Sequence, residues 1–89
     1  MHAVVVKVTI SDREAATQGL RDDVIPAVSQ APGFVAGYWT RKEGSDQGLS
    51  MTVFESEDAA NGAAERVRSM APDAVNVDDV EVREVVASA

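Results

Sequence analysis

The sequence has 89 residues and no cysteine, and its 15 acidic against 8 basic residues give a net charge of −7. A chain of this length is one domain, residues 1–89, and such a domain buries only roughly 60–65% of its unfolded surface, so its own core is thin. These figures exclude a disulfide framework and a thiol nucleophile, and they argue against nucleic acid as a partner because an acidic surface repels phosphate. No apolar run approaches the about 20 residues of a membrane span, and no leader pattern opens the chain, so we expect no membrane partner and a cytoplasmic location.

The first predicted strand covers His2–Ile10, where valines alternate with other residues. One face is wholly apolar and the other is mixed, the two sets being Val4, Val6, Val8 and Ile10, and Val5, Lys7 and Thr9. We expect helices to cover the apolar face and the mixed face to line something partly wet or filled by a ligand.

A helix is predicted over residues 12–30, because Ser11 and Asp12 supply an N-cap signal and apolar residues then recur at steps of three and four. Pro26 lies inside this pattern, and we expect a bend there because proline lacks the backbone N–H. Pro32 and Gly33 end the helix, since the residue before a proline leaves the helical region.

Two strands joined by a polar turn follow, Phe34–Lys42 and Leu49–Glu55, and they predict an antiparallel hairpin. Gly37 marks either a bulge or a close approach of the backbone. A second helix begins after the N-cap Ser56 and ends before Pro72, with a thin buried stripe made of Ala60, Ala63, Ala64, Val67 and Met70.

The last predicted strand covers Val75–Val86, with a bend or bulge at Asp78 and Asp79, where the alternation changes phase. The element order is that of the ferredoxin-like βαββαβ fold of the α+β class, which has a four-stranded antiparallel sheet with both helices on one face. We expect the uncovered face to carry apolar groups that include Val5, Phe54 or its neighbours, and Val85. Such a patch marks an interaction site, so the predicted partner is a second copy of the chain, in a homodimer through that face.

Three stretches in this order resemble the dimeric α+β barrel superfamily, and within it the antibiotic-biosynthesis-monooxygenase-like domains: Pro32–Val35, Val53–Ala59 and the ending Val80–Val86. The resemblance spans nearly the whole chain and implies two subunits whose sheets form one barrel. It also implies a pocket, either between sheet and helices or inside the barrel. Members include cofactor-independent oxygenases of polycyclic phenols, haem-degrading enzymes and proteins with no known activity.

The haem-degrading branch uses a helical histidine, whereas the single histidine here is His2, which we expect to be a frayed terminal residue. We therefore expect no cofactor.

Tyr38 and Trp39 are adjacent on the second strand, so one should pack under the helices and the other should enter the barrel. Both can stack on an aromatic ligand and hydrogen-bond to it, and both can equally fill a core of small side chains.

Four further residues are substrate-binding candidates: Lys7, Thr52, Phe54 and Arg83. The cations Lys7 and Arg83 can hold a phenolate or carboxylate, and they can equally form ion pairs with Glu81, Glu84 or an acid of a partner chain. The hydroxyl of Thr52, like that of Ser50, can bond a ligand. The acids at Asp73, Asp78 and Asp79 lack the spacing of a calcium loop, so no metal site is predicted.

Two functions from different classes follow. The first is a cofactor-independent monooxygenase of an electron-rich aromatic molecule, whose catalytic residues the sequence does not identify. The second is a non-catalytic homodimer that binds a small molecule or is purely structural.

Overall fold

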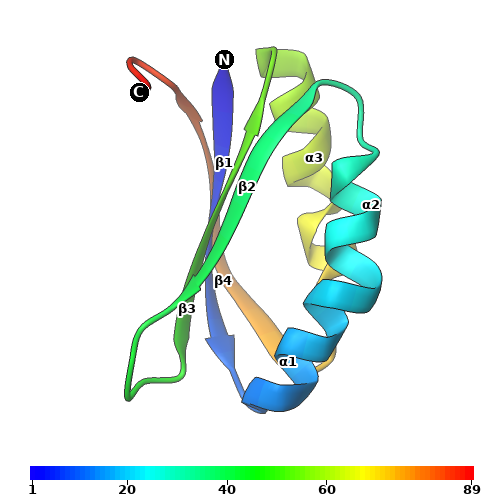
Figure 1. The fold of residues 1–89 in the computed structure, drawn as a ribbon, viewed down its shortest axis with the longest axis vertical. Helices are drawn as coiled ribbons and strands as arrows, with labels where there is room; N and C mark the ends of the chain where they lie inside the picture. The colour runs from blue at the N-terminus through cyan, green and yellow to red at the C-terminus, as the bar shows by residue number, and fades with distance from the viewer.

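The computed structural model describes all of residues 1–89. Its elements, in chain order, are β1 (His2–Ile10), α1 (Arg13–Gly19), the π-helical turn η1 (Leu20–Val24), α2 (Ile25–Ser29), β2 (Phe34–Arg41), β3 (Gln47–Phe54), α3 (Glu57–Met70) and β4 (Val75–Glu84). The strands form one sheet in the order β2-β3-β1-β4, and every neighbouring pair is antiparallel. All helices cover the same face of this sheet (Figure 1). The predicted α+β, ferredoxin-like fold is confirmed. None of the helices is long and apolar enough to cross a membrane.

The core lies between the sheet and α3. It consists of five buried residues, Val4, Val6, Phe54, Ala60 and Ala63. The ring of Phe54 is 1% exposed and meets the ring of Phe34 edge-on, with centroids 5.9 Å apart. Alanines on α3 let the helix lie close to the sheet, so the two phenylalanine rings supply most of the volume at this end of the molecule.

Phe54 itself does not lie on the uncovered face, whereas its neighbour Val53, which pairs with Ala3, does. In the β1–β3 ladder, Phe54 pairs with His2, and Thr52, two residues before Phe54, pairs with Val4. Side chains directly opposite each other in a ladder share a face, so Phe54 lies with Val4 and Val6 beneath the helices. Val5 does lie on the uncovered face, whereas Val85 follows the end of β4.

The irregularity predicted at Pro26 is a π-helical turn just before it. The backbone N–H of Ile25 donates to the carbonyl of Leu20, five residues back. Pro26 then occupies the first turn of α2, where its missing N–H has no intrahelical partner to lose. The wider turn thus carries the chain past the proline without ending the helix.

Two bulges interrupt the sheet. The β1–β4 register shifts between Lys7 and Val8 because Asp78 is an extra residue, as the phase change predicts. The β2–β3 register shifts at Val35, so the bulge on β2 lies there and not at Gly37. The strand ends differ from the predicted ones by one or two residues: β3 begins at Gln47 and β4 ends at Glu84.

The turn before β2 depends on Gly33, whose φ of 76° lies in the left-handed region that favours glycine. Its carbonyl accepts a hydrogen bond of 2.8 Å from the backbone N–H of Glu55. Next to this point, Ser56 caps α3 by accepting from the N–H of Ala59. The end of β3, the start of β2 and the start of α3 are thereby held together.

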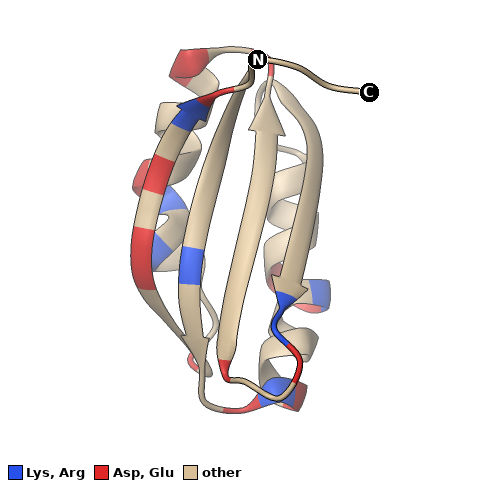
Figure 2. Cartoon of the chain, turned by 90° about the vertical axis from the view of Figure 1, so that its left-hand side faces the viewer, with Lys and Arg blue, Asp and Glu red and all other residues tan.

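The face of the sheet opposite the helices has no cover within the chain, and we call it the open face. Figure 2 views the sheet from this side and shows that charged residues occur mainly along β4, with one cation on β1, while β2 and β3 are uncharged along most of their length. On β4, Glu81 and Arg83 share the open face with Val5, since they pair with Val5 and Ala3. On β2 and β3, Tyr38, Leu49 and Met51 are 67%, 44% and 43% exposed. The open face is therefore apolar over β2 and β3 and charged along its β4 edge.

Candidate functional site

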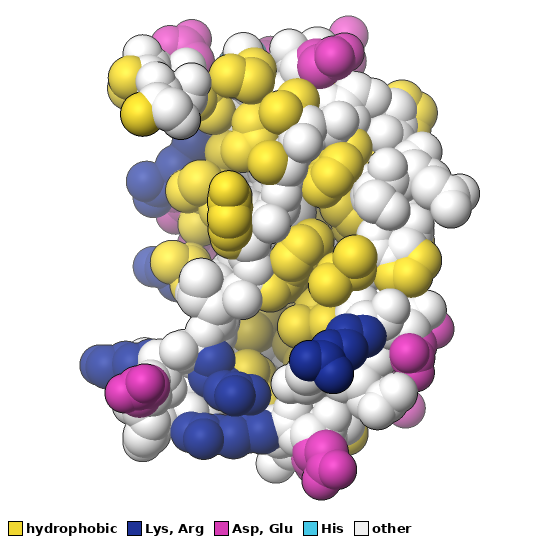
Figure 3. Space-filling model, in the orientation of Figure 1, with side chains coloured by type: hydrophobic (Ala, Val, Ile, Leu, Met, Phe, Trp, Pro, Cys, Tyr) yellow, Lys and Arg dark blue, Asp and Glu magenta, His cyan; other side chains and the backbone are white.

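A cavity of about 450 Å³ lies between the sheet and the helices. Of its 25 lining residues, 18 are hydrophobic, and they come from all four strands and from α1, η1, α2 and α3. Figure 3 shows hydrophobic side chains along the groove between β2 and the helices, where the cavity meets the surface. This volume falls within the range of pockets that enclose small organic molecules.

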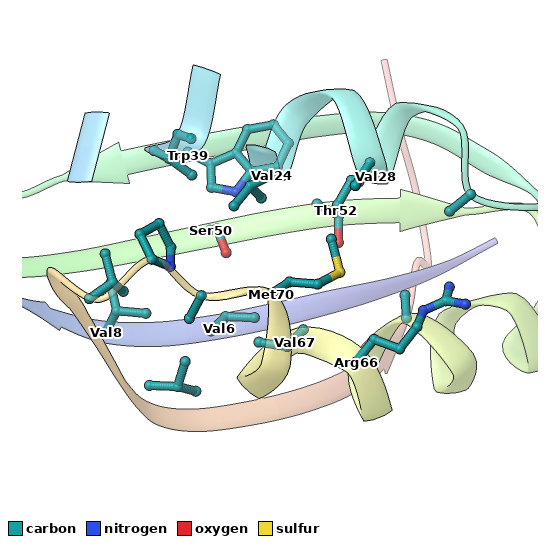
Figure 4. A pocket seen from close by; sticks show the side chains of 18 of the residues that line it. Val6, Val8, Val24, Val28, Trp39, Ser50, Thr52, Arg66, Val67 and Met70 are labelled. Atoms are coloured by element: carbon teal, nitrogen blue, oxygen red, sulfur yellow. The ribbon is translucent and has the colours of Figure 1, made fainter. Parts of the chain in front are cut away.

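Three polar groups point into this apolar space. They are the indole N–H of Trp39 on β2 and the hydroxyls of Ser50 and Thr52 on β3 (Figure 4). Trp39 pairs with Ser50, so the three groups lie on neighbouring positions of one face of the sheet. None of them makes a hydrogen bond within the chain, whereas the hydroxyl of neighbouring Thr40 donates to the carbonyl of Leu49. Few unpartnered polar groups in an apolar cavity are what a site needs to orient a ligand.

Gly37 gives the indole of Trp39 its place. A Cβ at Gly37 would lie 2.8 Å from Cη2 of Trp39 and 3.3 Å from Cγ2 of Thr52. The indole therefore folds back across Gly37 on the same face of β2, and this is the close approach that the glycine predicts. Any larger residue must push the ring away.

The change Gly37→Ala is expected to displace Trp39 and shift its fluorescence to the red, because the ring loses its apolar contact. Trp39 is the only tryptophan, so the emission reports this site alone. Gly62→Ala is the matched control, since a Cβ there meets nothing within 4 Å. An unchanged emission spectrum in Gly37→Ala would show that the ring does not rest on this glycine.

The sequence-predicted candidates divide between two faces. Trp39, Thr52 and Phe54 line the cavity, while Tyr38 and Lys7 lie on the open face, opposite Met51 and Leu49. The two aromatic residues do point to opposite sides of β2, as predicted. The cavity and the open face are separated by the thickness of the sheet, so these residues form no single site.

Arg83 lies on the open face and pairs with Glu81 on the same strand, at 2.6 Å between Nη2 and Oε2. The hydrogen bond from Arg83 and its positive charge lower the pKa of the Glu81 carboxyl. Lys7 lies four positions along β1 from the partner of Arg83, about 13 Å away. Arg83 thus takes the paired alternative, and the two cations do not converge.

Arg66 is the one titratable residue among those that line the cavity, and the sequence analysis did not single it out. It follows Ala63 by three positions on α3, which places both on one side of the helix. Its three-residue spacing from Ala63, a member of the predicted buried stripe, could have indicated from the sequence that Arg66 borders the cavity. No group of three or more His, Cys, Asp or Glu residues that could hold a metal ion is present.

His2 is not a frayed terminal residue. It belongs to β1 and pairs with Phe54 and Glu84. Its Nε2 lies 3.3 Å from Oε2 of Glu57 in the first turn of α3, and its Nδ1 is buried without a partner. The ladder on both sides of β1 fixes the residue, and it lies outside the cavity lining.

Comparison with known proteins supports the fold. No protein-family model and no curated protein sequence matches the chain. Among solved structures it is similar to the heme-degrader MhuD from Mycobacterium tuberculosis, a structure with two hemes bound in its active site. The two chains share 24% identity over 97% of this chain and 98% of the other, with a TM-score of 0.55. At this identity the likeness establishes a shared fold over the full length of both chains.

Proposed function

We propose that this protein binds a small aromatic molecule in the cavity between sheet and helices and acts on it as a monooxygenase, without a metal or cofactor. One observation carries the proposal: three unpartnered polar groups converge in an apolar space of about 450 Å³. The indole of Trp39 would stack on the ligand, and the hydroxyls of Ser50 and Thr52 would orient its oxygen atoms. The structural likeness to a heme-degrading enzyme supports an oxygenase role on this fold.

In such a reaction the substrate itself supplies the electrons. A phenolic ring reacts with O₂ to give a quinone and water: one oxygen atom replaces a ring hydrogen and becomes the second carbonyl, and the other leaves as water with that hydrogen and the phenol hydrogen. The protein therefore needs to bind and orient the ring and to exclude solvent. The cavity contributes an apolar wall around the ring and three groups that fix its position. Arg66, the one cation of the lining, would stabilise negative charge that develops on the ring oxygens.

A second candidate function is binding without turnover. It is favoured by the absence of any carboxylate, histidine or lysine from the cavity lining, since oxygenation of a phenol begins with loss of a proton. A substrate that ionises in water before it binds removes this objection. The two candidates therefore differ in turnover and share the same binding site.

Haem does not fit the residues that line this cavity. Haem iron is held by His, Cys or Tyr, or by Met together with His, and the cavity lining has Met70 but no His, Cys or Tyr. The imidazole of His2 lies elsewhere and contacts Glu57. We therefore derive no step through haem, and a haem titration without a shift of the Soret band is the expected outcome.

The oxygenase proposal is tested by oxygen uptake with a panel of hydroquinone-like substrates, with binding followed by calorimetry. Trp39→Phe is expected to lower uptake at least about tenfold, since it removes an orienting hydrogen bond and part of the stacking surface. Tyr38→Phe is the matched control on the opposite face and should leave uptake unchanged. Binding without uptake favours the second candidate, and the absence of binding by any of these compounds contradicts both.

We also infer that the protein is a homodimer through the open face. Alternation along β3 turns Leu49, Met51 and Val53 toward this face and Ser50 and Thr52 toward the helices. The strand thus presents its more apolar side away from its own core. In a monomer this arrangement is unfavourable, whereas two open faces packed around a two-fold axis bury it.

The charges of the open face suit this arrangement. Lys7 makes no ion pair within the chain, although it lies opposite Asp79 on β4. Twisted sheets that pack face to face cross at an angle. In a two-fold contact of this kind, Lys7 of each copy would lie near the acidic β4 edge of the other copy. The open face therefore has both the apolar centre and the charged rim of a protein interface.

A further inference from the structure

Basic residues gather at one end of the cavity in a chain whose net charge is −7. A second space, of about 580 Å³, opens there, and we call it the vestibule. Arg13 and Arg41 line it, and Figure 3 shows Lys and Arg side chains clustered at the lower end of the hydrophobic groove. Neither arginine has an acidic partner within ion-pair distance, since Arg83 is the only Lys or Arg that does.

The vestibule adjoins the apolar cavity. The two share five lining residues, which are Ile10, Ala16, Leu20, Trp39 and Thr40. Arg41 follows Trp39 by two positions on β2, so its side chain leaves the same face of the strand. A ligand that lies against the indole can therefore extend toward the guanidinium of Arg41.

Among the other polar groups of the vestibule, the two threonine hydroxyls already make hydrogen bonds within the chain, and one carboxylate is present. The hydroxyl of Thr40 donates to Leu49 and that of Thr17 to Arg13. Nη2 of Arg13 donates to the carbonyl of Ser45 at 3.0 Å, which holds this guanidinium at the vestibule wall. Glu43 is the one acid in the lining, so the two arginines leave the vestibule with a net charge of +1.

We propose that the ligand of this protein is an amphipathic acid, whose apolar body occupies the cavity and whose carboxylate lies in the vestibule between Arg13 and Arg41. The inference rests on the proposed function, because it assigns the class of the molecule that the cavity binds. The anionic group stays at the solvent-exposed end, where desolvation is small, and the guanidiniums donate charge-assisted hydrogen bonds to it. A neutral ligand of the same shape gains only the apolar contact.

A matched pair of probes tests the assignment. Naphthalene carboxylate and its isosteric carboxamide share the apolar body and differ in charge, and binding of each is followed by the fluorescence of Trp39 at pH 7 and low salt. The carboxylate is expected to bind roughly fivefold more tightly, and added salt should remove this preference because exposed charges are screened. Equal affinities for the two probes would overturn the proposal and leave the proposed function standing.

Substitutions locate the headgroup. Arg41→Gln should reduce the preference for the carboxylate to less than about twofold while the carboxamide binds as before, and Arg41→Lys should retain most of it. Arg21→Gln is the matched control, because Arg21 is an exposed cation that lines neither the cavity nor the vestibule. A preference that is lost in Arg21→Gln and kept in Arg41→Gln contradicts the assignment, and the absence of binding by either probe contradicts the proposed function as well.

Discussion

Met51→Glu is expected to convert the protein to a single 9.4 kDa species at micromolar concentration, as measured by sedimentation. Met51 lies near the centre of the open face, opposite Val5 on β1 and Tyr38 on β2. A two-fold axis brings two added carboxylates into one apolar contact. Burying unpaired charge there should weaken association at least about 100-fold, since 1.4 kcal/mol is a factor of ten.

The control for this change adds the same charge on the helix side. Ala15→Glu places a carboxylate on an exposed position of α1, where the helix start tolerates it. This variant should sediment as the unsubstituted protein does. An unsubstituted protein that itself sediments as a monomer would refute the homodimer and remove the reason for the outward apolar side of β3.

Phe54→Ala is expected to lower the free energy of unfolding by about 3–5 kcal/mol, the usual loss when a large aromatic residue is truncated in a core. The ring contacts Phe34 and belongs to the cluster with Val4 and Ala60. In a small domain the whole free energy of unfolding is about 5–15 kcal/mol, so this one change takes a large share of it. Denaturant titration at fixed protein concentration measures the difference.

Phe34→Ala is the matched control because it removes the same atoms from the other ring of the pair. Phe34 is only half-buried, so the loss should be smaller. Equal losses at the two positions would show that Phe54 is not the central residue of this core.

The order of the elements and the fold class could be read from the sequence because turn residues, caps and apolar periodicity all agree. The sequence does not show which side chains of β3 point toward the helices. Leu49, Met51 and Val53 are more apolar than Ser50 and Thr52, so alternation alone favours the opposite orientation. Phe54 ends the strand on the side of the hydroxyls, and only the pairing with β1 shows that this side meets the helices.

The division of the candidate site has the same origin. The sequence shows that Trp39 and Tyr38 point to opposite faces of β2, because they are adjacent on the strand. It does not show which of the two points toward the helices, because both are large aromatic residues. The pairing of Trp39 with Ser50, together with the pairings of β1 with β3 and β4, assigns every candidate to a face. Arg13 and Arg41 come from distant segments, and their approach depends on how the β2–β3 turn meets α1, which no local pattern records.

In the proposed homodimer, the hydroxyls of β3 line the cavity and its hydrophobic side chains contact the second copy, so that tertiary and quaternary structure would both depend on this one strand. The melting temperature should therefore rise as the protein is concentrated, as mass action requires when the folded state is shared between copies. Dilution alone would then loosen the wall on which Ser50 and Thr52 stand.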